Sequence, residues 1–162
     1  GKWMTGTQSF ESIAGGMASV DYLAGLDPTA NEEDLNRRQR LVRAMNQVSQ
    51  YERDLSRSML EGLGQIEGLR IYGIDRPEDL DHRFPTWSIR HDTVPTPELA
   101  RQLGKRGIQV WAGNYYALEM TEFLGLEPDG MVRIGPVHYN THAEIDTVLN
   151  ALEDVLPRAN VA

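Results

Sequence analysis

The stretch MVRIGPVHYNTHAEID, residues 131–146, contains a strand, a turn and the start of a helix. The apolar run over residues 131–134 predicts a short strand, and Gly135-Pro136 turns the chain after it. The segment Thr141-His-Ala-Glu144 is a capping box, in which Thr141 caps the helix and Glu144 reaches back to the cap. One apolar face then predicts the last helix, formed by Ile145, Val148, Leu149, Leu152 and Val155.

Arg133 interrupts the apolar strand. A guanidinium stays charged and is rarely buried without a partner, so this strand needs a negative group nearby. One candidate is the carboxylate of a small ligand, which an arginine binds through two parallel hydrogen bonds. The other is an internal salt bridge with one of the 24 Asp and Glu residues of the chain. The residues around Arg133 leave both possibilities open.

Outward from this stretch, the chain reads as two helices followed by short strands and helices. Ser9 fits an N-cap and predicts a helix over Ser9–Leu23 that ends at Gly25. Asn31 caps a second helix of roughly 30 residues, which reaches Gly64. The elements expected after it are strand Leu69–Tyr72, strand Pro85–Arg90, a helix with Thr96 as N-cap, strand Ile108–Trp111 and a short helix Ala117–Leu124.

This order of elements indicates an α+β fold. A small, mostly antiparallel sheet of about four strands is covered by helices, and two helices, one of them long, precede it. The second helix is longer than a small domain needs, so we expect it to contact something outside itself. We therefore expect exposed apolar residues on the first two helices, and self-association of the chain.

The composition narrows the classes of function. The 162 residues suffice for one domain, or for one domain plus an appendage, and 40% of them are hydrophobic, as in globular proteins. A formal net charge of −8 argues against nucleic acid or an anionic membrane as the main partner. The chain has no cysteine, hence no disulfide and no thiol nucleophile. No apolar run reaches ~18 residues and no signal peptide is visible, so we expect a cytoplasmic protein.

Two further segments are candidates for ligand binding. Thr5-Gly-Thr-Gln-Ser9 places a glycine and hydroxyl residues before a helix, which suits a phosphate, although a turn with an N-cap is the commoner meaning of this pattern. In Gly113-Asn-Tyr-Tyr-Ala117, Asn114 and the two tyrosines either line a ligand pocket or, as is commoner for aromatic residues, pack in the core or an interface. The histidines show no metal-ligand spacing.

Several of these segments together resemble the class V aminotransferases, the family of cysteine desulfurases, selenocysteine lyases and isopenicillin N epimerase. Gly6-Thr7-Gln8 resembles the family's Gly-Thr segment before a helix, and Gly107–Gly113 resembles its strand and loop over the substrate. The C-terminal segments resemble its Arg-bearing strand, Tyr-Asn-Thr motif and last helix: Val132-Arg133-Ile134, Tyr139-Asn140-Thr141 and Glu144-Ile145-Asp146. The matches run in order along nearly the whole chain, and cysteine-desulfurase-like proteins are the most similar subgroup.

This resemblance implies the C-terminal part of a fold-type-I enzyme that uses pyridoxal phosphate and forms a homodimer. It implies that Arg133 binds the α-carboxylate of an amino-acid substrate, and that Asn114 and Tyr116 shape side-chain selectivity. It also implies that Thr7, with Gly6 and Gln8, contacts the phosphate of the cofactor. Residues 1–30 would then join the large domain of the parent enzyme, and residues 31–162 would form the small C-terminal α+β domain.

Two departures from the family pattern limit what this chain is expected to do alone. Where desulfurases of one type carry a persulfide cysteine in the loop, this chain has Tyr116, and it has Trp111 where a second arginine is common. The family's cofactor-binding lysine follows a histidine, whereas neither Lys2 nor Lys105 does. We therefore expect a fragment that is inactive and binds no cofactor by itself. The alternative is a non-catalytic binding or interaction module that keeps the fold.

Overall fold

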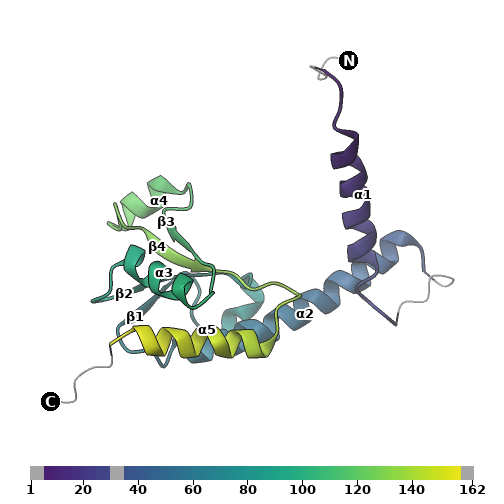
Figure 1. Ribbon diagram of the computed structural model, residues 1–162. Coiled ribbons are helices and arrows are strands. Elements are labelled where there is room, and N and C mark those ends of the chain that lie inside the picture. The colour runs from purple at the N-terminus through teal and green to yellow at the C-terminus, as the bar shows by residue number, and fades with distance from the viewer. Residues whose placement is uncertain (1–5, 30–34, 158–162) are drawn as a thin grey trace. The chain divides into compact units, whose positions relative to one another are not determined.

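The computed structural model (Figure 1) describes residues 6–29 and 35–157. The chain divides into two compact units after Gln50. The first unit comprises Gly1–Gln50 and the second Tyr51–Ala162. Helix α2 crosses the division, and each unit is described by itself. The elements in chain order are α1 (Phe10–Ala24), α2 (Arg37–Leu63), β1 (Leu69–Tyr72), the 3-10 helix η1 (Pro77–His82), β2 (Trp87–His91), α3 (Thr96–Lys105), β3 (Trp111–Gly113), α4 (Leu118–Phe123), β4 (Met131–Ile134) and α5 (His142–Val155).

Helix α1 begins and ends where its sequence signals predict. The Ser9 side chain accepts a hydrogen bond from the Ser12 amide, as an N-cap does, and Gly25 is the C-cap. The predicted start of the second helix at Asn31 lies outside the described residues, and α2 runs from Arg37 to Leu63.

A buried aspartate organises the segment between these helices. Asp27 has a fully buried side chain, which accepts hydrogen bonds from the Thr29 amide at 2.9 Å and the Thr29 hydroxyl at 2.6 Å. Arg43 of α2 donates to the same carboxylate at 2.9 Å. Charge-assisted bonds of this kind hold the turn after α1 against the first part of α2.

The second unit contains one four-stranded sheet with strand order β1-β2-β4-β3. All three pairings, β1 with β2, β2 with β4 and β3 with β4, are antiparallel. The predicted α+β fold with a small antiparallel sheet is therefore confirmed. The predicted strand over residues 131–134 is β4, and it occupies an inner position between β2 and β3.

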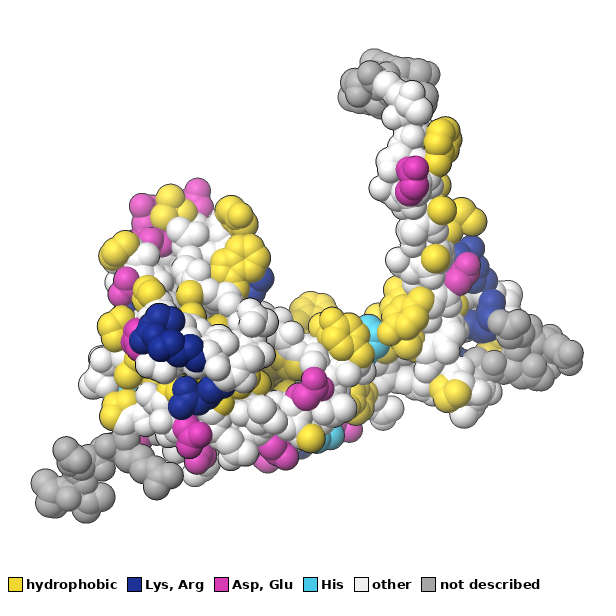
Figure 2. Space-filling model, viewed as in Figure 1, with side chains coloured by type: hydrophobic (Ala, Val, Ile, Leu, Met, Phe, Trp, Pro, Cys, Tyr) yellow, Lys and Arg dark blue, Asp and Glu magenta, His cyan; other side chains and the backbone are white. Residues whose placement is uncertain are grey.

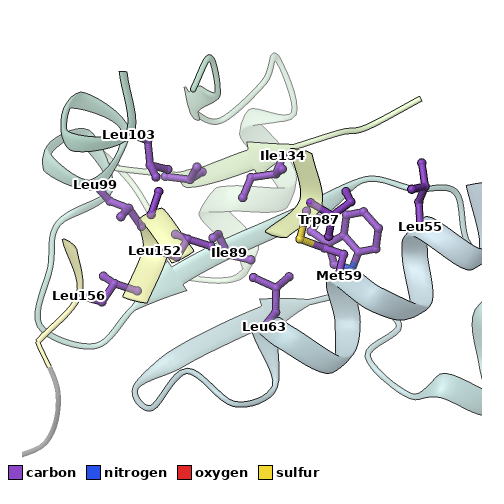
Figure 3. Packing of buried hydrophobic residues seen from close by; sticks show 13 residues of the cluster. Leu55, Met59, Leu63, Trp87, Ile89, Leu99, Leu103, Ile134, Leu152 and Leu156 are labelled. Carbon is purple, nitrogen blue, oxygen red and sulfur yellow. The ribbon is translucent and has the colours of Figure 1, made fainter. Parts of the chain in front are cut away.

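One face of the sheet carries the core. Because strand residues alternate between faces, Trp87 and Ile89 of β2 pack on the same side as their cross-strand partners Ile134 and Val132 of β4. Three helices cover this face with fully or nearly fully buried side chains (Figure 3). They contribute Leu55, Met59 and Leu63 from α2, Leu99 and Leu103 from α3, and Ile145, Leu152 and Leu156 from α5 and its end. Ser88 and Arg133, which pair with each other, therefore lie on the opposite face.

The start of α5 matches its sequence signal in detail. The Thr141 side chain accepts from the Glu144 amide at 3.2 Å, and the Glu144 carboxylate accepts from the Thr141 amide at 2.7 Å. This reciprocal pair is the capping box that the Thr-x-x-Glu spacing predicts.

Two details of the sequence prediction are wrong. The strand expected over Ile108–Trp111 is displaced, because the Ile108 amide bonds back to the Leu103 carbonyl and closes α3, so that pairing with β4 begins only at Trp111. Thr96 is not an N-cap; Pro95 holds that position. The Thr96 side chain is buried instead and donates to the Gly130 carbonyl at 3.2 Å, because that carbonyl needs a partner inside the fold.

The predicted exposed apolar residues are present on the first two helices. Figure 2 shows hydrophobic side chains along α1. The exposed large apolar side chains of this unit are Phe10, Ile13, Met17, Val20 and Tyr22 on α1 and Val42 and Met45 on α2. Across the described residues, no helix has the length and apolarity needed to cross a membrane.

Candidate functional site

Arg133 lies on the sheet face opposite the core. On β4 its neighbours Val132 and Ile134 point into the core, so the arginine side chain points the other way and is half-buried. Across the sheet it is flanked by Ser88 of β2 and Trp111 of β3. The strand thus places one cation in the middle of a face that no core helix covers.

Aromatic rings hold the Arg133 guanidinium. Its central carbon lies 5.1 Å from the centroid of the Trp111 ring and 5.0 Å from that of the Tyr115 ring, and both distances are within cation–π range. Within residues 6–29 and 35–157, no carboxylate pairs with Arg133 and no hydrogen bond engages its guanidinium. Rings restrain the group without occupying its in-plane N–H donors, so these donors remain available for an anion.

A pocket of about 420 Å³ opens beside this guanidinium. Arg133 is the single charged residue in its wall, whose other members are Thr86, Gln109, Val110, Trp111 and Gly135. The gap arises where β3 begins late, since residues 109 and 110 do not pair with the segment after Ile134. The volume lies within the usual range for small-molecule sites.

The loop after β3 has an unusual backbone. Tyr115 and Tyr116 have φ angles of 55° and 63°, in the left-handed region that non-glycine residues rarely adopt. The Asn114 side-chain oxygen accepts from the Tyr116 amide at 3.2 Å, and the Asn114 carbonyl accepts from the Ala117 amide at 2.8 Å. These bonds offset part of the backbone strain, and the conformation turns the Tyr115 ring toward Arg133.

The Tyr115 hydroxyl is buried and, among the described residues, has no hydrogen-bond partner of standard geometry. Burial raises the pKa of Tyr115 to about 12, although the nearby Ser88 hydroxyl and the charge of Arg133 act in the opposite direction. The phenol is therefore neutral at physiological pH, and it faces Arg133 as an uncharged ring.

The predicted site residues divide between the two units. Arg133 lines the pocket, whereas Asn114 does not line the pocket but stabilises the loop after β3. Tyr116 is 90% exposed and contacts the edge of Trp111, with ring centroids 5.9 Å apart. The residues expected to contact a cofactor phosphate, Gly6, Thr7 and Gln8, are exposed and belong to the first unit, directly before the Ser9 cap.

The sequence did not identify Tyr115 as the residue against Arg133, nor Thr86 and Gln109 as pocket residues. The pairing of Trp111 with Arg133 could have been found from the strand register, had the strand been assigned three residues later. A left-handed conformation at two successive tyrosines has no sequence signal.

The described residues do not fit covalent attachment of a pyridoxal cofactor. The lysine among them is Lys105, which is exposed in the last turn of α3, where no surrounding residues would exclude water from it. In the same part of the chain, no group of three or more His, Asp or Glu side chains could hold a metal ion.

Residues 4–148 match the family model described as Aminotransferase class-V. The chain belongs to the class-V aminotransferase family. Members of this family depend on pyridoxal phosphate. The chain is 30% identical over 148 residues to an uncharacterized protein of Mycobacterium tuberculosis, covering 91% of this chain and 35% of the relative. It is 29% identical over 151 residues to a probable cysteine desulfurase of Pseudomonas putida, covering 93% and 31%.

Solved structures agree with this family. The cysteine desulfurase CsdA of Escherichia coli superposes with a TM-score of 0.70 over 94% of this chain and 32% of its own, at 22% identity, which shows the shared fold. The apo cysteine desulfurase of Thermococcus onnurineus has a TM-score of 0.63 at 25% identity, over 74% of this chain and 28% of its own. The chain thus spans about a third of the length of the curated relatives it matches.

Proposed function

We propose that this chain is the substrate-binding small domain of a pyridoxal-phosphate-dependent enzyme that acts on an amino acid, of the cysteine desulfurase-like or aminotransferase kind. The observation that carries the proposal is Arg133: its guanidinium is restrained by two rings, has no ion pair within the described residues, and is the single charge in its pocket. A half-buried guanidinium with free donors matches a carboxylate, which it binds through two parallel hydrogen bonds.

In this proposal, Arg133 holds the α-carboxylate and the strand fixes the position of the bound molecule. Since Arg133 sits on an inner strand of the sheet, its Cα has little freedom to move. The aromatic contacts reduce the number of side-chain rotamers that would have to be frozen on binding. The residues of this chain thereby bind and orient the substrate.

The cofactor chemistry would come from elsewhere in the parent polypeptide. Pyridoxal phosphate supplies an electron sink for carbanions when it is bound. Because Lys105 is exposed, we assign attachment of the cofactor to a large domain, which residues 1–30 would join while residues 31–162 form the small domain. We keep Thr7, with Gly6 and Gln8, as the predicted contact to the cofactor phosphate in a cytoplasmic homodimer. Asn114 and Tyr116 remain predicted determinants of side-chain selectivity.

Sulfur transfer to a cysteine of this chain is excluded by composition, because the chain has none. Tyr116 stands where the resemblance places the loop cysteine of one type of desulfurase. If the parent enzyme releases sulfur, the sulfur must leave to an acceptor outside this chain.

The test is a titration of the chain with L-alanine, followed by the shifts of backbone amide resonances. We expect saturable shifts in β3 and β4, and loss of saturation in Arg133→Gln. Arg57→Gln is the matched control. Arg57 is exposed on α2, and its replacement removes the same charge at a position distant in sequence from Arg133. Equal binding by wild type and Arg133→Gln would remove Arg133 from the site.

The second candidate, a non-catalytic binding module, is favoured by the exposed position of Lys105. The two candidates predict different protein sequences to be encoded upstream of residue 1. A preceding large α/β domain with a His-Lys segment supports the enzyme, and its absence supports the module.

A further inference from the structure

The wall of the Arg133 pocket carries no charge other than that of Arg133. Apart from Arg133 it consists of Val110, Trp111, Gly135 and the uncharged polar residues Thr86 and Gln109. With Arg133 bound to the α-carboxylate, a carboxylate or ammonium on the side chain of the same amino acid would find no free opposite charge in this wall. The wall therefore offers acidic and basic side chains no ion pair, and any hydration that they lose there is uncompensated.

An exposed aromatic surface stands at the same place. Trp111 is 48% exposed although it lines the pocket, and the still more exposed Tyr116 contacts it in an edge-to-face geometry with an interplanar angle of 76°. In Figure 2 hydrophobic side chains gather over β3, which begins at Trp111, and over α4, which begins two residues after Tyr116. Contiguous exposed apolar surface marks interaction or ligand-binding sites, whereas single exposed apolar residues are normal.

The Arg133 guanidinium and the exposed aromatic rings lie close enough for one small molecule to contact both. Trp111 pairs directly with Arg133 across β3 and β4, and its ring centroid is 5.1 Å from the guanidinium carbon. The Asn114 hydrogen bond to the Tyr116 amide fixes the backbone from which the second ring projects. A molecule anchored by its carboxylate at Arg133 would have the Trp111 ring beside it, and the centroid of the Tyr116 ring lies 5.9 Å from that of Trp111.

We propose that the substrate is an amino acid with an uncharged, apolar side chain, aromatic above all, which packs against Trp111 and Tyr116. This inference rests on the carboxylate site of the proposed function and adds the class of side chain. Aromatic pairs of this geometry strengthen binding about threefold to tenfold.

The test compares the dissociation constants of L-phenylalanine, L-alanine, L-glutamate and L-lysine for the chain, measured from amide shift titrations. We expect L-phenylalanine to bind about threefold to tenfold more tightly than L-alanine, and the two charged amino acids to bind more weakly than L-alanine. In Trp111→Leu and in Tyr116→Ala the ratio of the L-phenylalanine and L-alanine constants should approach one. Phe123→Ala, which removes an exposed ring of α4 outside the pocket wall, should leave the ratio unchanged.

The outcomes separate the two proposals. Equal constants for L-phenylalanine and L-alanine, with binding of both lost in Arg133→Gln, would overturn the side-chain inference and leave the carboxylate site standing. The side-chain inference would also be overturned if L-glutamate or L-lysine bound more tightly than L-alanine. The same holds if the ratio of the L-phenylalanine and L-alanine constants were unchanged in both Trp111→Leu and Tyr116→Ala. No saturable binding of any of the four would contradict both proposals. Tyr116→Ala should not disturb folding, because the Tyr116 side chain is exposed to solvent. Far-ultraviolet circular dichroism verifies that each variant is folded.

Discussion

Arg133 and Tyr115 show how single residues define the site. The arginine is restrained by rings, and the tyrosine that supplies one ring buries its hydroxyl without a partner of standard geometry among the described residues. A buried hydroxyl without a hydrogen bond costs roughly 1–3 kcal/mol relative to solvent. Tyr115, which positions the Arg133 guanidinium, therefore lowers the stability of the protein through its buried hydroxyl.

Replacing Tyr115 by phenylalanine tests this cost. Tyr115→Phe keeps the ring against Arg133 and removes the unpaired hydroxyl, so we expect the free energy of unfolding to rise by about 1 kcal/mol. Urea denaturation followed by circular dichroism measures the change. A loss of more than about 1 kcal/mol would show instead that the hydroxyl has a hydrogen-bond partner, for which Ser88 is the candidate.

A second residue-scale prediction concerns Asp27. Hydrogen bonds from the Thr29 hydroxyl and amide, together with the charge of Arg43, lower the pKa of Asp27 from 3.8 to about 2, against the opposing effect of burial. Because the pKa is lower in the folded state, the stabilisation is present above about pH 4 and is lost as the pH falls toward 2.

The measurement is the difference in Tm between wild type and Asp27→Asn as a function of pH. We expect wild type to be the more stable protein at pH 7, and the difference to shrink between about pH 4 and pH 2. Asp146→Asn, on the exposed side of α5, is the matched control for the removal of one carboxylate. A constant difference across this range would mean that Asp27 is not held as an anion.

At the scale of elements, close packing of α2 on α5 depends on a glycine. A Cβ built on Gly62 would lie 2.3 Å from Leu149 Cδ1 and 2.7 Å from Leu149 Cδ2, far inside van der Waals contact. Gly104 in α3 is the opposite case, because a Cβ there would meet nothing within 4 Å. We therefore expect replacement of glycine by alanine to change the free energy of unfolding in opposite directions in the two helices.

We predict that Gly62→Ala destabilises the protein by about 1–3 kcal/mol, since overpacking outweighs the better helix propensity of alanine. Gly104→Ala should stabilise it by about 0.5–1 kcal/mol, because only the propensity changes. Urea unfolding of both variants measures the two changes in the free energy of unfolding. A neutral Gly62→Ala would mean that Leu149 can repack without cost.

Elements whose signals are local were predicted well. The capping box at Thr141 and Glu144 and the apolar run of β4 depend on neighbouring residues, and both lie where the sequence places them. Strand β3 was misplaced because Ile108 and Val110 alternate like strand residues, yet they pack against the core from a loop that closes α3. The contact of Tyr115 with Arg133 depends on strand register and a left-handed backbone, and neither is encoded by residue type.

At the scale of the whole molecule, the first two helices carry large apolar side chains that are exposed to solvent. Ile13 and Met17 lie one turn apart on α1 and are both exposed. The cost of hydrating such a surface favours association, either with another part of a parent enzyme or with a second copy.

We predict that the chain self-associates with increasing concentration. The double substitution Ile13→Glu and Met17→Glu should weaken association at least about tenfold, because charge on the surface must then be desolvated. Ser19→Glu adds a charge to α1 at a polar position and should have a smaller effect. Sedimentation velocity over a concentration series measures this, and a wild-type chain that stays monomeric throughout would contradict the prediction.

The central claim is that the Arg133 guanidinium binds the carboxylate of an amino acid. The most direct test is a crystal structure of the wild-type chain with L-alanine. We predict that both carboxylate oxygens lie within hydrogen-bond distance of the Arg133 guanidinium, in the pocket lined by Trp111 and Gln109. A structure in which Arg133 instead forms an ion pair with an Asp or Glu of its own chain, with L-alanine bound elsewhere, would contradict the claim.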